Sequence, residues 1–240
     1  MAIPCLKCLH LILTLFFLIL PTYYAQASPA SAAPPALTKL FQHITQTQPH
    51  TFFCHLPISP QGKVNFQSCG YCPIEPVSVI ALRIVPNAIL AKNLPCYQHK
   101  LCSKPNRYFY QGISCCQKID ILYQRMAQDL HNWVPEIRHI KQLWGTHIPS
   151  VLPNIPASLS CHELTLDKKK HLIHVPEAQR GAVARIYLYM ADTYQLKLEQ
   201  ELRNTLESWH ELYAITAWEK TRNRLIYQAQ GTYNHRIERL

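Results

Sequence analysis

The chain has 240 residues, of which 48% are hydrophobic and 16% charged, and its formal net charge is +10 with a pI ≈ 9.1. This length suits one sizeable domain or at most two small ones. Every apolar run after Ala36 is broken by charges, prolines or histidines, which excludes a transmembrane helix in the mature chain. So basic a protein suits a polyanionic partner such as nucleic acid or an anionic membrane surface, unless the charge serves solubility alone.

The first residues, Met1 to Ala27, have the three parts of a secretory signal. Lys7 lies in the short basic region, Leu11 to Leu20 form the apolar run, and Ala25 to Ala27 form a small-residue cleavage site. We therefore predict cleavage after Ala27 and a mature protein that is periplasmic or secreted.

Cysteine usage agrees with export. Two of the ten cysteines belong to the leader, and an even number in an exported chain favours disulfides over metal ligation. Cys69 and Cys72 have the spacing of half a zinc site, but no second closely spaced pair completes a standard pattern. Cys115 and Cys116 are adjacent, so we expect them to bond to different partners. The disulfide candidates are Cys54, Cys69, Cys72, Cys96, Cys102, Cys115, Cys116 and Cys161.

The first half of the mature chain is predicted to hold short elements. Residues 28–36 are rich in Pro, Ala and Ser, which indicates a flexible linker before a fold that begins near Leu37. Between residues 51 and 85, apolar pieces alternate with Pro, Gly and Cys, which favours short strands. Residues 96–116 form a loop with cysteines at both ends. A helix ending near Trp133 follows, with one apolar face made by Ile119, Leu122, Tyr123, Met126 and Leu130.

The second half is predicted to be mainly helical. Three prolines in residues 149–156 indicate an extended connection, and residues 161–175 supply one or two strands. Pro176 suits the first position of a helix whose buried stripe is Val183, Ile186, Tyr187, Met190 and Tyr194.

Two further helices complete this half. One has an apolar face made by Leu202, Leu206, Trp209 and Tyr213. The last begins at a capping box, Thr216 to Glu219, and ends at Gly231. The fold class predicted from these elements is α+β, with short strands, disulfide-bonded loops and a helical C-terminal half.

A basic, aromatic segment lies between Glu75 and Asp120, where the chain has no acidic residue. Cations with interleaved aromatic rings can hold phosphates and stack bases, so the segment predicts a nucleic-acid surface; the alternative is a solvated basic loop. The cations are Arg83, Lys92, Lys100, Lys104, Arg107 and Lys118, and the rings are those of Tyr97, Tyr108, Phe109 and Tyr110.

Several motifs resemble the bacterial endonuclease I family. The C-terminal ones match in order and spacing, whereas those upstream are weaker. They are Arg180 to Met190, Trp209 to Tyr213, Thr216 to Lys220 and Gln230-Gly231-x-x-Asn234, with Gln67 to Tyr71, the loop from Cys96 to Cys116, and Asp129 to Asn132 upstream.

The resemblance implies an exported, disulfide-bonded ββα-metal nuclease, here a monomer, that cleaves DNA and often RNA with a divalent metal such as Mg²⁺. In such nucleases a Glu-His-x-Val-Pro-Ala stretch supplies a metal ligand and the base that activates water, and the Asn of a Leu-x-Asn motif is a second ligand. Asn132 stands at that Asn position.

The chain departs from this pattern at the catalytic pair. Aligning on Val85-Pro86 places Leu82 at the Glu position and Arg83 at the His position. Leucine has no lone pair for a metal, and a guanidinium stays protonated and cannot act as a base. From Pro76 to Ile119 there is no Asp or Glu and only His99, so no other register recovers the pair.

A replacement metal site is conceivable from His131, Asn132, Glu136, His139 and His147, because Glu136 and His139 would share a face of a helix. The alternative is that these are ordinary residues in a chain with 13 histidines. Arg138 and Lys141 are candidate phosphate contacts. Arg180 and Arg185 are either nucleic-acid contacts or structural charges.

Three functions follow. The first is a catalytically impaired nuclease fold that binds nucleic acid or another polyanion, with Arg83, Lys100, Lys104 and Arg107 as the contacts. The second is an active metal-dependent DNA/RNA endonuclease with altered ligands. The third is a protein-interaction module on the same scaffold.

Overall fold

The computed structural model describes residues 39–40, 42–43, 49–64, 77–153 and 164–238. The predicted signal, the linker and the candidate disulfide residues Cys69, Cys72 and Cys161 lie outside these ranges. None of the described helices is long and apolar enough to cross a membrane.

At the centre, two antiparallel strands are followed by a helix. Strand β3 (Ile80–Arg83) pairs with β6 (Trp133–Glu136), so that Arg83 lies opposite Trp133, and α6 (Arg138–Trp144) comes next in the chain. The indole nitrogen of Trp144 donates to the Ile84 carbonyl at 2.9 Å, which fastens α6 to the end of β3. This order and pairing agree with the ββα element that the resemblance implies.

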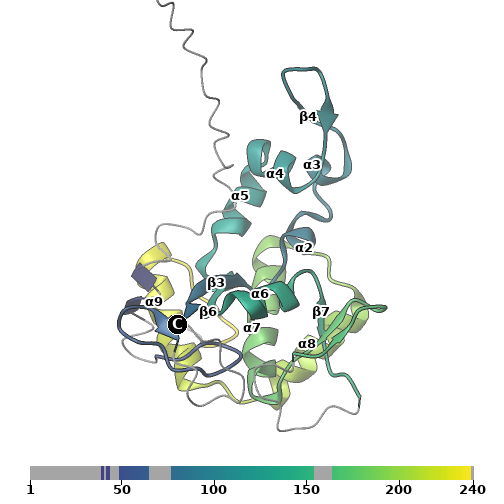
Figure 1. Ribbon diagram of the computed structural model, residues 1–240. Helices are drawn as coiled ribbons and strands as arrows, with labels where there is room; N and C mark the ends of the chain where they lie inside the picture. The colour runs from purple at the N-terminus through teal and green to yellow at the C-terminus, as the bar shows by residue number, and fades with distance from the viewer. Residues whose placement is uncertain (1–38, 41, 44–48, 65–76, 154–163, 239–240) are drawn as a thin grey trace, which may run out of the picture.

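Between β3 and β6 the chain leaves the body and returns. It forms α2 (Asn87–Ala91), α3 (Pro95–Gln98), β4 (Cys102–Ser103), β5 (Phe109–Tyr110), α4 (Ile113–Ile119) and α5 (Ile121–Gln128). We call residues 96–116 the finger, because the β4–β5 hairpin projects away from the rest of the molecule (Figure 1).

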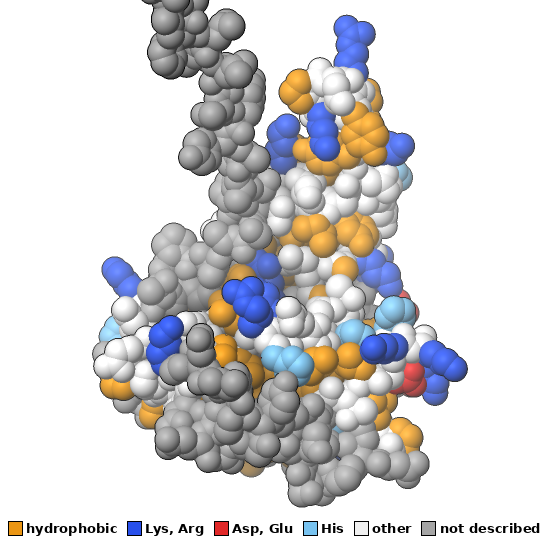
Figure 2. Space-filling model, viewed as in Figure 1, with side chains coloured by type: hydrophobic (Ala, Val, Ile, Leu, Met, Phe, Trp, Pro, Cys, Tyr) orange, Lys and Arg blue, Asp and Glu red, His pale blue; other side chains and the backbone are white. Residues whose placement is uncertain are grey.

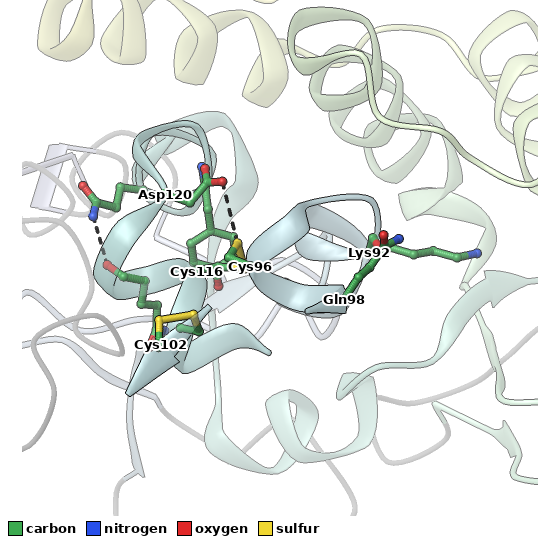
Figure 3. The surroundings of a disulfide bond; sticks show 10 residues. Lys92, Cys96, Gln98, Cys102, Cys116 and Asp120 are labelled. Carbon is green, nitrogen blue, oxygen red and sulfur yellow. Dashed lines mark hydrogen bonds between the residues drawn. A yellow bond between two sulfur atoms is a disulfide. The ribbon is translucent and has the colours of Figure 1, made fainter. Parts of the chain in front are cut away.

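Two disulfides hold the finger. Cys96 bonds to Cys116, and Cys102 bonds to Cys115 (Figure 3). The expectation that the adjacent cysteines have different partners is therefore confirmed. Cys96 lies on α3 and Cys102 at the start of β4, while both of their partners lie on α4, so the projecting segment is tied at two points.

The predicted helix ending near Trp133 is wrong in its extent. Asp120 interrupts it: α4 ends at Ile119, and the Asp120 carboxylate caps α5 by accepting from Tyr123 N at 2.8 Å. Ile119 and Leu122 of the expected apolar face are 48% and 44% exposed. The side chain of a short polar residue can bond to the backbone and start a new helix in place of continuing the old one. The periodic stripe predicted as one helix therefore spans parts of two.

The C-terminal half is helical, as predicted. It contains α7 (Glu177–Tyr194), α8 (Gln200–Leu212) and α9 (Ala217–Gln230), and the capping box of Thr216 and Glu219 is present. Pro176 is the residue just before α7 rather than its first residue. Between α6 and α7 the chain forms β7 (Ile148–Ser150), β8 (Leu166–Asp167) and β9 (Leu172–His174). These strands make a small sheet in the order β7-β9-β8. Strands β1 (Lys63–Val64) and β2 (Val77–Ser78) pair in a separate two-stranded sheet.

Helix α7 runs through the core, and a buried ion pair joins it to α9. Arg185 donates to both carboxylate oxygens of Glu219, at 2.6 and 2.9 Å, and to the Tyr213 carbonyl at 2.9 Å. Gly181 leaves room for this guanidinium, since a Cβ at that position would lie 2.5 Å from Arg185 Nη2. Arg185 is thus a structural charge, which was one of the two readings of its sequence context.

Candidate functional site

A cavity of about 180 Å³ lies where β3, the start of α2, β6 and α6 meet. Its size admits a small hydrated group, because one water needs only about 10–15 Å³ of such space. The lining includes Leu82, Arg83, Pro86, Asn87, Trp133 and Lys141. Two of these residues are cations, and none is a carboxylate.

Arg83 is held in one position in this cavity. Its Nη2 donates to the Ala127 carbonyl at 3.0 Å, and the guanidinium lies 4.0 Å from the centre of the Trp133 ring. Burial lowers the pKa of Arg83, but a guanidinium remains protonated in proteins. The cavity therefore carries a fixed positive charge.

Lys141 faces the same cavity from α6. Although its side chain reaches solvent, partial desolvation lowers the pKa of Lys141, and repulsion from Arg83 and Arg138 lowers it further. Lys141, one of the two candidate phosphate contacts of α6, is thus brought to the cavity of Arg83. No local signal in the sequence predicted this juxtaposition, since β3 and α6 are far apart in the chain.

Asn132, the predicted metal ligand, is fully buried in the 3-10 turn Leu130–Asn132. Its Oδ1 accepts from Val85 N at 2.7 Å, and its Nδ2 donates to Val85 O at 3.0 Å. Both ends of the amide are therefore engaged by the backbone of one residue, and this pairing fixes the amide orientation. In this structure Asn132 acts as a clamp between the end of β3 and the turn.

The turn itself is fastened from several sides. The Asp129 carboxylate accepts from the hydroxyls of Tyr189 and Tyr194 at 3.0 and 2.8 Å. One nitrogen of Arg222, Nη2, donates to the carbonyls of Leu130, His131 and Trp133. His131 is buried here, and desolvation lowers its pKa to about 4, so its imidazole is neutral at neutral pH.

The conceivable replacement metal site is not assembled. Glu136 lies in β6 rather than on a helix, and its carboxylate accepts from Phe53 N and Ile137 N at 2.7 and 2.9 Å. His139 is exposed on α6, whereas His147 has its ring 6.1 Å from that of His171. Across the described ranges, no group of three His, Cys, Asp or Glu side chains could hold a metal ion.

We expect Glu136 to give the folded protein an unusual dependence of its stability on pH. Complete burial raises its pKa from 4.5 to about 7, against the opposing hydrogen bonds from Phe53, Ile137 and Cys54. The folded protein therefore binds this proton more tightly than the unfolded chain. The resulting stabilisation is full below about pH 4.5 and is lost as the pH rises through about 7.

The test compares Glu136→Gln with the wild type by urea unfolding from pH 5 to pH 8. As the pH rises, the wild type should lose up to about 3 kcal/mol relative to the variant, because Gln does not titrate. The depressed pKa of His131 acts in the opposite direction, but it is common to both proteins and cancels in the difference. Parallel pH profiles would contradict the assignment.

A larger cavity, of about 320 Å³, lies between residues 49–55 and the first turns of α7 and α9. Its lining is mostly apolar and includes no Lys or Arg. The polar His55 and Gln179 in it contact each other at 2.7 Å. This cavity is therefore less suited to an anionic ligand than the one at Arg83.

Comparison with known proteins gives the family. The family model for Endonuclease I matches residues 95–239. An Extracellular deoxyribonuclease of Aeromonas hydrophila is 32% identical over 216 residues, which cover 87% of each chain. The chain belongs to the endonuclease I family. A Periplasmic deoxyribonuclease of the same species is 29% identical, and the match covers 91% of this chain and 89% of the relative. An Endonuclease-1 of Buchnera aphidicola subsp. Baizongia pistaciae (strain Bp) is also 29% identical, and the match covers 82% of this chain and 80% of the relative.

Membership of the endonuclease I family implies a divalent metal, but the residues at the ββα cavity do not fit one. The lining offers Leu82, Arg83 and Lys141, and no carboxylate, whereas hard cations take oxygen ligands. A divalent ion about 4 Å from the Arg83 guanidinium would meet repulsion of roughly 2 kcal/mol in water-like surroundings, and more where water is excluded.

The finger presents the other predicted contacts of this family member. Lys100, Lys104 and Arg107 are exposed, and Lys104 lies 5.6 Å from the Tyr108 ring centre. Tyr108 and Phe109 are 58% and 56% exposed. Figure 2 shows Lys and Arg side chains next to hydrophobic ones around the projecting end.

The backbone orders the tip of the finger. Lys104 N bonds to Tyr108 O and Arg107 N bonds to Lys104 O, each at 3.0 Å, and Arg107 has φ 61°. In the described part of the chain, no carboxylate forms an ion pair with these three cations. Their charge is therefore available to an external anion.

Arg180, by contrast, is used internally. Its guanidinium donates to Val175 O at 3.1 Å and to the Tyr213 hydroxyl at 3.0 Å, and it lies over the ring of Trp209. The two arginines of α7, Arg180 and Arg185, therefore both have structural roles.

Proposed function

We propose that this endonuclease I family protein is exported, binds nucleic acid, and is impaired in the hydrolysis of phosphodiester bonds. The observation that carries the proposal is the cavity at the ββα element, where Arg83 and Lys141 stand and no carboxylate does. When the sequence is aligned on Val85-Pro86, Leu82 and Arg83 stand at the positions of the family's Glu-His pair. The amide of Asn132 is engaged by the backbone of Val85. Loss of a positioned base alone typically costs about 10²–10⁴-fold in rate.

Nucleic-acid binding does not depend on the groups that hydrolysis needs. Phosphate contacts depend on cations that are free of internal carboxylates, and the finger supplies Lys100, Lys104 and Arg107. Exposed Tyr108 and Phe109 offer faces on which bases can stack. DNA and RNA both present these chemical features, so the proposal covers either.

Export is supported by three observations. The chain begins with a sequence that has the parts of a secretory signal. Two disulfides are present in the finger, and disulfides persist outside the cytoplasm. The relatives are named as periplasmic or extracellular enzymes.

The decisive experiment exposes supercoiled plasmid to the purified, oxidised protein with Mg²⁺, Mn²⁺ or Zn²⁺. We expect no cleavage above an EDTA control, together with retardation of the plasmid in a gel at low salt. A mock purification from the same host controls for contaminating nuclease. Metal-dependent cleavage that EDTA abolishes would instead support an active nuclease with altered ligands.

A matched variant separates lost chemistry from lost binding. Leu82→Glu combined with Arg83→His restores the pair on the same strand, and its cleavage is measured beside the wild type. If the wild type retards neither the plasmid nor an RNA at any salt concentration, nucleic-acid binding is refuted and a protein-interaction module is favoured.

A further inference from the structure

We propose that the cavity lined by Arg83 and Lys141 is a metal-free phosphate site, which holds a phosphate group of a nucleic acid. The inference rests on the proposed function and adds where a phosphate is bound and by which groups. Both a terminal phosphomonoester and an internal phosphodiester carry the chemistry that the cavity recognises.

The cavity carries positive charge that no carboxylate compensates. Arg83 and Lys141 line the same cavity, and Arg138 is close enough to lower the pKa of Lys141. Over the residues that the structure describes, none of the three forms an ion pair with a carboxylate. Repulsion among like charges is relieved when an anion enters.

Two of the residues that line the cavity have hydrogen-bond donors without acceptors. The Nε of Arg83 and the Nε1 of Trp133 are buried and have no partner, and both residues line the cavity. Buried polar groups are normally satisfied, so orphaned donors around one cavity indicate a ligand that accepts. The Asn87 side-chain oxygen also lacks a partner; a half-turn of that amide presents its NH₂ group instead.

The guanidinium of Arg83 is preorganised for a ligand. The Ala127 carbonyl and the Trp133 ring hold the guanidinium before any ligand arrives. A planar guanidinium matches the oxygens of phosphate, and a fixed one loses little side-chain entropy on binding. Lys141 adds a second positive charge to the cavity from α6. The pair neutralises a phosphate but supplies no group that takes a proton from water.

The experiment is isothermal titration calorimetry at constant ionic strength with EDTA present. The probes are inorganic phosphate and one oligonucleotide in two forms, with a 5′-phosphate or a 5′-hydroxyl. The variants are Arg83→Gln and Lys141→Gln, with Lys197→Gln as a control on an exposed residue away from the cavity. Circular dichroism and thermal unfolding check that each variant folds.

We expect the wild type and Lys197→Gln to bind inorganic phosphate equally. Lys141→Gln and Arg83→Gln should each weaken that binding, by roughly tenfold to a hundredfold for Arg83, because charge-assisted hydrogen bonds are lost. Since Lys141 is exposed, its variant remains informative if Arg83→Gln fails to fold. Phosphate affinities that are equal in the wild type and in Lys141→Gln would overturn the proposal.

The two oligonucleotides distinguish the sources. A preference for the 5′-phosphate form that disappears in Lys141→Gln identifies a terminal phosphate, and equal binding of both forms with the same loss in the variant identifies an internal one. If long DNA binds with no dependence on Arg83 or Lys141, this site is refuted while nucleic-acid binding stands. If inorganic phosphate binds at the cavity but neither DNA nor RNA binds, the proposed function fails, and the cavity binds the phosphate of a ligand other than a nucleic acid.

Discussion

Replacing Glu219 by alanine is expected to lower the free energy of unfolding by about 3–5 kcal/mol. The reason is that Arg185 would keep its charge in the core, where its side chain is 1% exposed, with no carboxylate beside it. The same substitution removes half of the capping box with Thr216. Denaturant unfolding of the purified protein measures the effect.

Two comparisons make this result interpretable. Glu199→Ala breaks the ion pair between Lys92 and the largely exposed carboxylate of Glu199. This variant should leave the free energy of unfolding unchanged within error. A double variant, Arg185→Met with Glu219→Leu, should be more stable than Glu219→Ala, because no unpaired charge stays buried. A loss below about 1 kcal/mol in Glu219→Ala would show that the pair does not fasten α7 to α9.

Neutralising the finger is expected to have the largest effect on binding. In a triple variant of Lys100→Gln, Lys104→Gln and Arg107→Gln, the affinity for duplex DNA should fall and the binding should become less sensitive to salt. Each lost phosphate contact reduces the slope of log K against log salt by roughly 0.9, or about 3 in total. Filter binding or fluorescence anisotropy over a range of salt concentrations measures both quantities.

A control with the same change of net charge is available in the chain. Lys168, Lys169 and Lys170 are exposed between β8 and β9, so the triple Gln variant there removes three charges from another surface. It should retain the wild-type salt slope within about one unit. Equal losses in the two triple variants would show that only overall charge matters and that the finger is not the binding surface.

Much of the scaffold could be predicted from local sequence. The capping box at Thr216, the stop at Gly231 and the different partners of Cys115 and Cys116 follow from short-range stereochemistry, and each is present. The helix prediction was wrong where a polar residue interrupts a periodic pattern of apolar residues. Asp120 divides one expected helix into two, because its carboxylate satisfies the amides of a new helix start.

The candidate site, like the scaffold, can be predicted from the sequence only in part. The residue types alone establish that no Asp or Glu lies from Pro76 to Ile119 and that Arg83 follows Leu82, because they can be read without a structure. Two contacts became visible only in the folded protein: Lys141 shares a cavity with Arg83, and the backbone of Val85 forms hydrogen bonds with both ends of the Asn132 amide. Those contacts join β3 to α6 and to the turn before β6, and long-range packing of this kind leaves no trace in local residue patterns.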